Sequence, residues 1–211
     1  MQLEDLLKSP EEIVAEPEPM NIPDYMLNDP EIVGYPDVEM QDDIYRWVAN
    51  DIRYGATVKD FGCGRGDFAD TYLKYLWPNS DDKYIGIDKN PFLIEAGIRK
   101  WRSKYEFALK HGDWFEDYTM TDYTVCIGSL NEIESKDLSD LLWKTLRHAL
   151  ATTKERVIFV LNTEPEDGYN HFPLDTIIYT LSGFPNKPFK IDCSRYKGIC
   201  KLTVFCNEFE L

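Results

Sequence analysis

A glycine-rich stretch at residues 58–67, V-K-D-F-G-C-G-R-G-D, constrains the fold of this chain more than any other feature. The residues before the first glycine are typical of a short buried strand, and residues 68–76 have the apolar spacing of a helix. Gly62, Gly64 and Gly66 allow the backbone to turn sharply and to approach a ligand closely, where any side chain would clash. The stretch therefore predicts a strand, a ligand-binding turn and a helix whose first N–H groups are open to an anion.

The rest of the chain alternates between strand-like and helix-like segments. Strands are predicted at residues 57–61, 83–88, 106–109, 122–128 and 156–161, with a terminal hairpin at 188–192 and 199–205. Helices are predicted at residues 37–53, 68–77, 91–102, 136–151 (with Ser135 as its cap) and 174–181. This alternation predicts an α/β, Rossmann-like doubly wound fold. Its mostly parallel seven-stranded sheet has an antiparallel terminal strand and helices on both faces.

Acidic residues stand at the ends of the predicted strands. Asp60 precedes the glycines in the pattern D-x-G-x-G-x-G, and Asp88 ends the second strand, 22 residues after Gly66. The dinucleotide fingerprint G-x-G-x-x-G would require a third glycine where this chain has Asp67. The pattern instead resembles the first motif of class I S-adenosylmethionine (SAM)-dependent methyltransferases. A G-D pair that ends at Asp113, after the third strand, resembles the adenine-binding element of the same family.

The resemblance covers residues 37–206 and implies a role for each matching position. Asp60 is expected near the methionine end of SAM, Asp88 at the ribose hydroxyls and Asp113 at the exocyclic amine of adenine, with Trp114 or Phe115 against the ring. The cofactor-binding residues that it implies are Asp60, Gly62, Cys63, Gly64, Asp88, Lys89, Asp113, Trp114 and Gly128.

Catalytic residues are harder to assign, because methyl transfer from a sulfonium mainly requires alignment of donor and acceptor, plus a base where the acceptor carries a proton. His171 is the candidate base and Asn131 the candidate for orienting an acceptor, although a loop role and a helix-capping role remain open for them. The N/D-P-P-Y/F/W motif of amino-methylating nucleic-acid enzymes is absent, since residues 129–132 read S-L-N-E. No Pro-Cys pair stands there either, which argues against methylation of a cytosine ring carbon.

The charge is concentrated at the N-terminus. Residues 1–50 hold 13 acidic and 2 basic residues, against a net charge of −15 for the chain, and half of the 12 prolines lie within residues 1–36. We therefore expect an extended acidic, proline-rich leader over residues 1–36, which could dock on the body or on a protein partner, and a SAM-binding domain over residues 37–211. No basic face is evident, so nucleic acid is an unfavoured partner.

The cysteines and the hydropathy indicate an intracellular protein. The five cysteines form no C-x-x-C pair and are interpreted as reduced thiols without a metal site. No run of 18 apolar residues and no secretory signal is present, so no membrane association is expected and a cytoplasmic location is predicted.

Three functions fit these features. The leading hypothesis is a SAM-dependent methyltransferase that acts on a small-molecule or protein acceptor. The alternative is a non-catalytic or structural protein with the same fold, which docks partners through its acidic arm. A nicotinamide-dependent oxidoreductase is disfavoured by Asp67.

Overall fold

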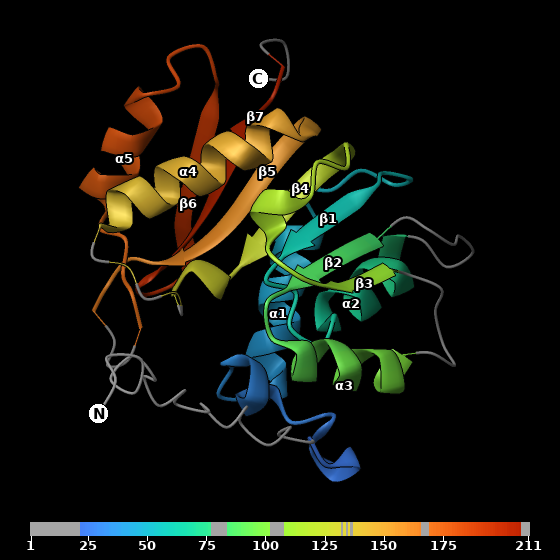
Figure 1. Ribbon diagram of the computed structural model, residues 1–211. Coiled ribbons are helices and arrows are strands. Elements are labelled where there is room, and N and C mark those ends of the chain that lie inside the picture. The colour runs from blue at the N-terminus through green and yellow to red at the C-terminus, as the bar shows by residue number, and fades with distance from the viewer. Residues whose placement is uncertain are drawn as a thin grey trace, which may run out of the picture.

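A seven-stranded sheet forms the centre of the computed structural model, which describes residues 22–76, 84–101, 108–131, 133, 135, 137–165 and 169–207. The strand order is β3-β2-β1-β4-β5-β7-β6 (Figure 1). The strands are β1 (Val58–Phe61), β2 (Tyr84–Asp88), β3 (Ala108–His111), β4 (Thr121–Ile127), β5 (Thr153–Asn162), β6 (Phe189–Tyr196) and β7 (Ile199–Phe205). The first five are parallel, and β7 runs antiparallel to both β5 and β6. The predicted fold class is therefore confirmed.

Helices cover both faces of the sheet. The α-helices are α1 (Val38–Ala49), α2 (Asp67–Leu76), α3 (Pro91–Trp101), α4 (Leu138–Ala151) and α5 (Leu174–Ser182). Short 3-10 turns are η2 (Asp24–Met26), η3 (Pro30–Val33), η4 (Trp114–Glu116) and η5 (Ser129–Asn131). The first three α-helices lie on one face and α4 and α5 on the other (Figure 1). Within the described residues, no helix is both long and apolar enough to cross a membrane.

The two faces of the sheet bury two separate cores, because successive side chains of a strand point to opposite sides. In β5, Ile158 and Val160 pack with α1 and α2, whereas Val157 and Phe159 pack with α4 and α5. Strands that are buried on both faces in this way explain the continuous apolar runs of the sequence.

Several predicted boundaries were wrong. The first helix ends at Ala49 and not at residue 53, because the N–H groups of Asp51 and Ile52 turn back to carbonyls three residues earlier. The cap of α4 is Asp137, whose carboxylate accepts a hydrogen bond from the Asp140 N–H at 2.9 Å, and not Ser135. β5 begins at Thr153, three residues early. The predicted end of the second helix, at residue 77, lies outside the described residues.

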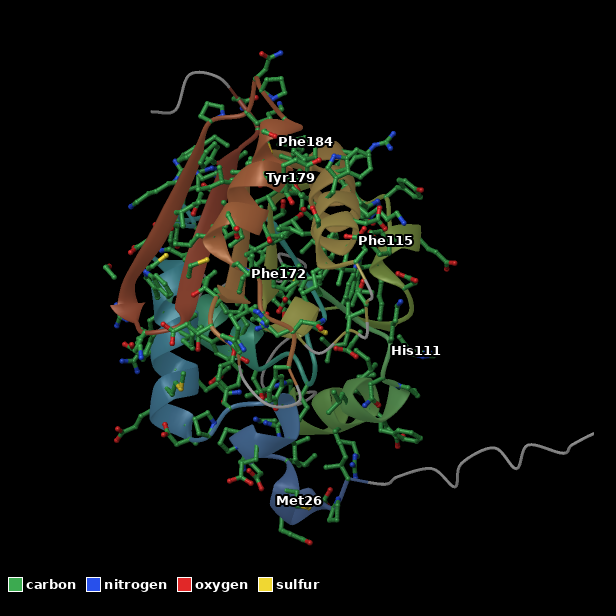
Figure 2. The ribbon with its side chains drawn as sticks, turned by 90° about the vertical axis from the view of Figure 1, so that its left-hand side faces the viewer. Met26, His111, Phe115, Phe172, Tyr179 and Phe184 are labelled. Carbon is green, nitrogen blue, oxygen red and sulfur yellow. The ribbon has the colours of Figure 1, made fainter. Side chains whose placement is uncertain are left out.

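Residues 22–36, which the sequence assigned to the leader, contact the body of the domain. We call this segment the strap. The Arg99 guanidinium on α3 donates to the Ile22 carbonyl at 2.7 Å and pairs with Asp24 at 3.0 Å. Arg65, in the glycine-rich turn, donates to the Met26 carbonyl at 3.0 Å. Met26 lies on the short segment below the body in Figure 2. The rest of the leader, residues 1–21, lies outside the described residues.

Candidate functional site

The carboxyl ends of β1 and β4 meet at the centre of the sheet, where the chain order reverses. Open α/β sheets bind ligands at this point. Gly62 follows β1 with a φ of +68°, and its N–H donates to the Ile87 carbonyl at 2.8 Å. Ser129 follows β4, and its hydroxyl donates to the Gly62 carbonyl at 2.7 Å. The two strand ends are thus joined directly, and the turn is fixed from both sides.

Asp88, at the end of β2, supports the glycine-rich turn. One carboxylate oxygen accepts the Gly64 N–H and the other accepts the Asn90 N–H, each at 2.8 Å. Burial raises the pKa of Asp88 above its ordinary value. The hydrogen bonds from the two backbone N–H groups lower the pKa and offset part of this increase. The carboxylate that the sequence assigned to a ribose therefore also sets the shape of the loop.

Asp60 lies deeper, with 3% of its surface exposed. The Tyr84 hydroxyl donates to its carboxylate at 2.5 Å. Burial raises the pKa of Asp60 to about 7, although the hydrogen bond from Tyr84 lowers it; the nearby charge of Asp88 adds to the increase. Asp60 is not among the residues that line the cavity described below, so its contact with a cofactor stays a prediction.

The raised pKa of Asp60 predicts a stability that falls as the pH rises. Between about pH 4 and pH 7 the folded chain keeps a proton that the unfolded chain has lost, and this disfavours folding at higher pH. Asp60→Asn removes the titration while an amide oxygen still accepts from Tyr84. We compare the free energy of unfolding of the variant with that of the wild type. We expect this difference to favour the variant by about 1–3 kcal/mol more at pH 8 than at pH 4.5. Urea unfolding at both pH values measures this, and a pH-independent difference would contradict it.

The residues assigned to adenine lie beside the glycine-rich turn. Asp113 forms an ion pair with Lys89 at 3.0 Å, and Lys89 lies 5.7 Å from the centre of the Trp114 ring. Trp114 is buried and stacks on Phe61 at 5.7 Å between ring centres. Its ring edge lies 3.4 Å from the position that a Cβ on Gly62 would occupy. Trp114 therefore has a packing role, and its contact with a ligand stays a prediction.

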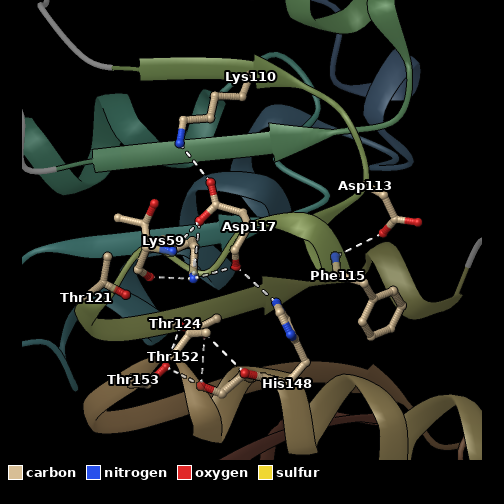
Figure 3. A network of polar contacts seen from close by, with 12 residues as sticks. Lys59, Lys110, Asp113, Phe115, Asp117, Thr121, Thr124, His148, Thr152 and Thr153 are labelled. Atoms are coloured by element: carbon tan, nitrogen blue, oxygen red, sulfur yellow. Dashed lines mark hydrogen bonds and ion pairs between the residues drawn. The ribbon is translucent and has the colours of Figure 1, made fainter.

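A polar network holds the segment that follows Asp113 (Figure 3). The Lys59 ammonium, fully buried in β1, donates to the Thr119 carbonyl at 2.7 Å, and Lys110 pairs with the Asp117 carboxylate at 2.7 Å. Burial raises the pKa of Asp117, but hydrogen bonds from Lys110 and Thr119 outweigh this and lower it to about 2. The network therefore fixes the loop between β3 and β4.

A cavity of about 420 Å³ opens beside the meeting point of β1 and β4. Of the predicted site residues, Gly62, Cys63, Gly128 and Asn131 line it. Burial raises the pKa of the Cys63 thiol, so this group is protonated at neutral pH and is a wall residue. His171, the predicted base, is not among the lining residues. Its catalytic role stays a prediction without geometric support.

The strap forms the other side of the cavity, through residues 31–36. Val33 lies 3.0 Å from the position that a Cβ on Gly64 would occupy. The predicted site did not include the strap, although the apolar run at residues 32–35 was the available signal. It also missed Asn162, which ends β5.

Arg65 anchors the strap to the turn from a fully buried position. It donates to one carboxylate oxygen of Asp67 at 2.7 Å, and Lys100 binds the other at 2.8 Å. Asp67 is the first residue of α2, and its carboxylate binds these two cations. Asp67, which stands where the dinucleotide fingerprint requires a glycine, therefore binds the Arg65 guanidinium. The same guanidinium donates to the Met26 carbonyl of the strap.

Solved structures share this fold at low sequence identity. A magnesium protoporphyrin IX methyltransferase from Synechocystis, crystallised with bound SAM, is 15% identical with a TM-score of 0.62, and the match covers 86% of this chain and 93% of that one. A putative O-methyltransferase from Nostoc punctiforme is 12% identical with a TM-score of 0.62, over 79% and 57% of the two chains. The [4+2]-cyclase SpnF is 14% identical with a TM-score of 0.60, over 79% and 81%.

These likenesses confirm that the chain has the fold of class I SAM-dependent methyltransferases. No protein-family model matches the sequence, and a search of curated proteins finds no match. The presence of a cyclase among the similar structures shows that this fold hosts more than one reaction. The chemistry must therefore be argued from the site.

Proposed function

We propose that this chain binds SAM at the glycine-rich turn and transfers its methyl group to an acceptor held in the adjoining cavity. The observation that carries the proposal is the Asp88 carboxylate, which fixes the Gly64 N–H at the edge of a turn that opens into that cavity. The methionine end of SAM would lie along Gly62 and Gly128, where a Cβ on Gly128 would meet nothing within 4 Å. Asp88 would face the ribose, and Asp113 and Trp114 the adenine.

The cavity supports a catalytic interpretation over a purely structural one. SAM supplies an electrophilic methyl group, and the protein then has to align an acceptor and exclude water. The strap and α1 form part of the cavity wall, the strap through Tyr35 and α1 through Met40. Gly128 lines the same cavity. A walled volume next to the proposed donor position serves the alignment of an acceptor.

Calorimetric titration with SAM and with S-adenosylhomocysteine (SAH) tests the proposal. We expect both to bind with micromolar dissociation constants, equivalent to about −8 kcal/mol. NAD⁺ serves as the matched control, because the position of Asp67 departs from the dinucleotide fingerprint. Binding of NAD⁺ alone, or of none of the three by a folded sample, would refute the assignment.

We predict that loss of a contact that anchors the strap lowers the affinity for the cofactor. Arg99→Ala removes the contacts to Ile22 and Asp24, so the strap should open more often. We expect SAM affinity to fall by about 5–10-fold, the effect of one or two hydrogen bonds, and chymotrypsin to cleave faster after Tyr25. Lys144→Ala, which removes an exposed ion pair on α4, is the control and should change neither quantity. Equal behaviour of the two variants would disconnect the strap from the site.

A further inference from the structure

The wall of the cavity shows which charge an acceptor can carry. Among the described residues that line it, Glu31 is the charged side chain, and none is a lysine, arginine or histidine. The remaining polar side chains include the amides of Asn131 and Asn162 and the phenol of Tyr169. A carboxylate or phosphate acceptor would lose its hydration without gaining a cation from the described lining residues, which is costly.

The described residues that follow the two strand ends have the same charge bias. Asp137 follows β4, and Glu164 follows β5. The ammonium of Lys197 lies 3.6 Å from the Glu164 carboxylate and pairs with it. Both acids follow the carboxyl ends of strands at which the ligand is expected to enter. Their charge attracts a cation and repels an anion.

Among the described residues that line the cavity, none is a histidine or a lysine that could act as the base for an alcohol or a phenol. Removal of a hydroxyl proton during transfer requires a positioned group with a pKa near the working pH. Asp60 has such a pKa but is buried under Tyr84, outside the lining, and His171 is also outside it. A neutral amine carries its own lone pair and needs no base in the transfer step itself.

We propose that the acceptor is a small primary or secondary amine that is methylated on nitrogen; this inference rests on the proposed methyltransferase function. The amine arrives as an ammonium ion, drawn by Glu31 and by the acids Asp137 and Glu164, and releases a proton to solvent. The nitrogen lone pair then forms a bond to the methyl carbon as the carbon–sulfur bond breaks, and the bonding pair remains on sulfur as SAH. Asn131, whose main chain and amide are fixed by Asn170 and Asn162, provides a rigid polar wall for the nitrogen.

A matched series of head groups tests the inference. The SAH-loaded chain is titrated with 2-phenylethylamine, 2-phenylethanol and 3-phenylpropanoate, and with the butyl analogues of all three. We expect an amine to bind at least about tenfold more tightly than its alcohol, with no measurable carboxylate binding. With SAM in place of SAH, the same amine should gain 14 mass units. Preference for an alcohol or a carboxylate, or no binding of any amine to the SAH-loaded chain, would overturn the inference.

Charge variants separate the acceptor class from the cofactor site. Glu31→Gln should weaken amine binding severalfold and leave SAH affinity unchanged. Glu95→Gln makes the same change in net charge at an exposed position on α3, outside the lining, and should leave both affinities unchanged. Equal weakening of amine binding by the two variants would indicate a general charge effect and refute the role of the cavity. A wild-type chain that fails to bind SAH would instead refute the methyltransferase proposal.

Discussion

Asp88→Ala is expected to weaken SAM binding by about 100-fold or more, the largest loss that a single side chain of this site should produce. The carboxylate holds the Gly64 and Asn90 N–H groups at 2.8 Å, and we propose that it also accepts the ribose hydroxyls of SAM. Truncation would therefore remove the proposed contact and leave a part-buried loop N–H without its acceptor. Calorimetry with SAM measures the loss.

Two further variants separate these tasks. Asp88→Asn keeps one oxygen as an acceptor, so we expect an intermediate affinity. Asp192→Ala removes a carboxylate that accepts a backbone N–H two residues ahead, Ser194, in the same way but at the β6 edge of the sheet. This control should leave SAM affinity unchanged. Urea unfolding of each variant shows that the chain remains folded, and a folded Asp88→Ala chain with wild-type affinity would contradict the assigned role.

The central part of the fold could be predicted from the sequence because its signals are local. Buried parallel strands give short apolar runs, and the glycine spacing at residues 62–66 fixes the turn between β1 and α2. The terminal hairpin around Gly198 was predictable for the same reason, since a glycine with a φ of +76° joins its strands. Helix ends were less accurate. Asp137 and Ser135 are both good caps, and only the tertiary structure chooses between them.

The candidate site was predictable where residues follow strand ends. Gly62, Asp88 and Gly128 lie where the order of the parallel strands requires, because the carboxyl ends of such strands share one edge of the sheet. Contacts between distant segments carried no such signal. The anchoring of the strap by Arg65 depends on a pairing of residues 39 positions apart, and a single sequence does not reveal it.

His171 was selected from residue chemistry and not from position, because histidine is a common base in enzymes. The next residue, Phe172, is fully buried in the core (Figure 2) and its N–H donates to the Asn162 carbonyl at 2.6 Å. That packing sets the direction of the loop. The residues that line the cavity from this loop and from β5 are Tyr169, Asn162 and Val160.

Gly62→Ala is expected to destabilise the chain by about 3–5 kcal/mol, the sum of backbone strain and a steric clash. Gly62 has a φ of +68°, which disfavours any side chain. In addition, a Cβ there would lie 2.2 Å from the Ser129 hydroxyl oxygen and 2.3 Å from its Cβ. Because Ser129 also donates to the Gly62 carbonyl, it cannot move without breaking the contact between the ends of β1 and β4. Urea unfolding measures the free energy.

Gly128→Ala provides the matched control. Its φ of +80° imposes a similar strain, but a Cβ there would meet nothing within 4 Å, so a loss of only about 1–2 kcal/mol is expected. A double-mutant cycle then isolates the clash. Ser129→Gly alone should cost about 1 kcal/mol through the lost hydrogen bond, yet in the Gly62→Ala background it should restore stability. Equal losses for the two alanine variants, or no rescue by Ser129→Gly, would show that the junction of β1 and β4 does not depend on the absence of a side chain at Gly62.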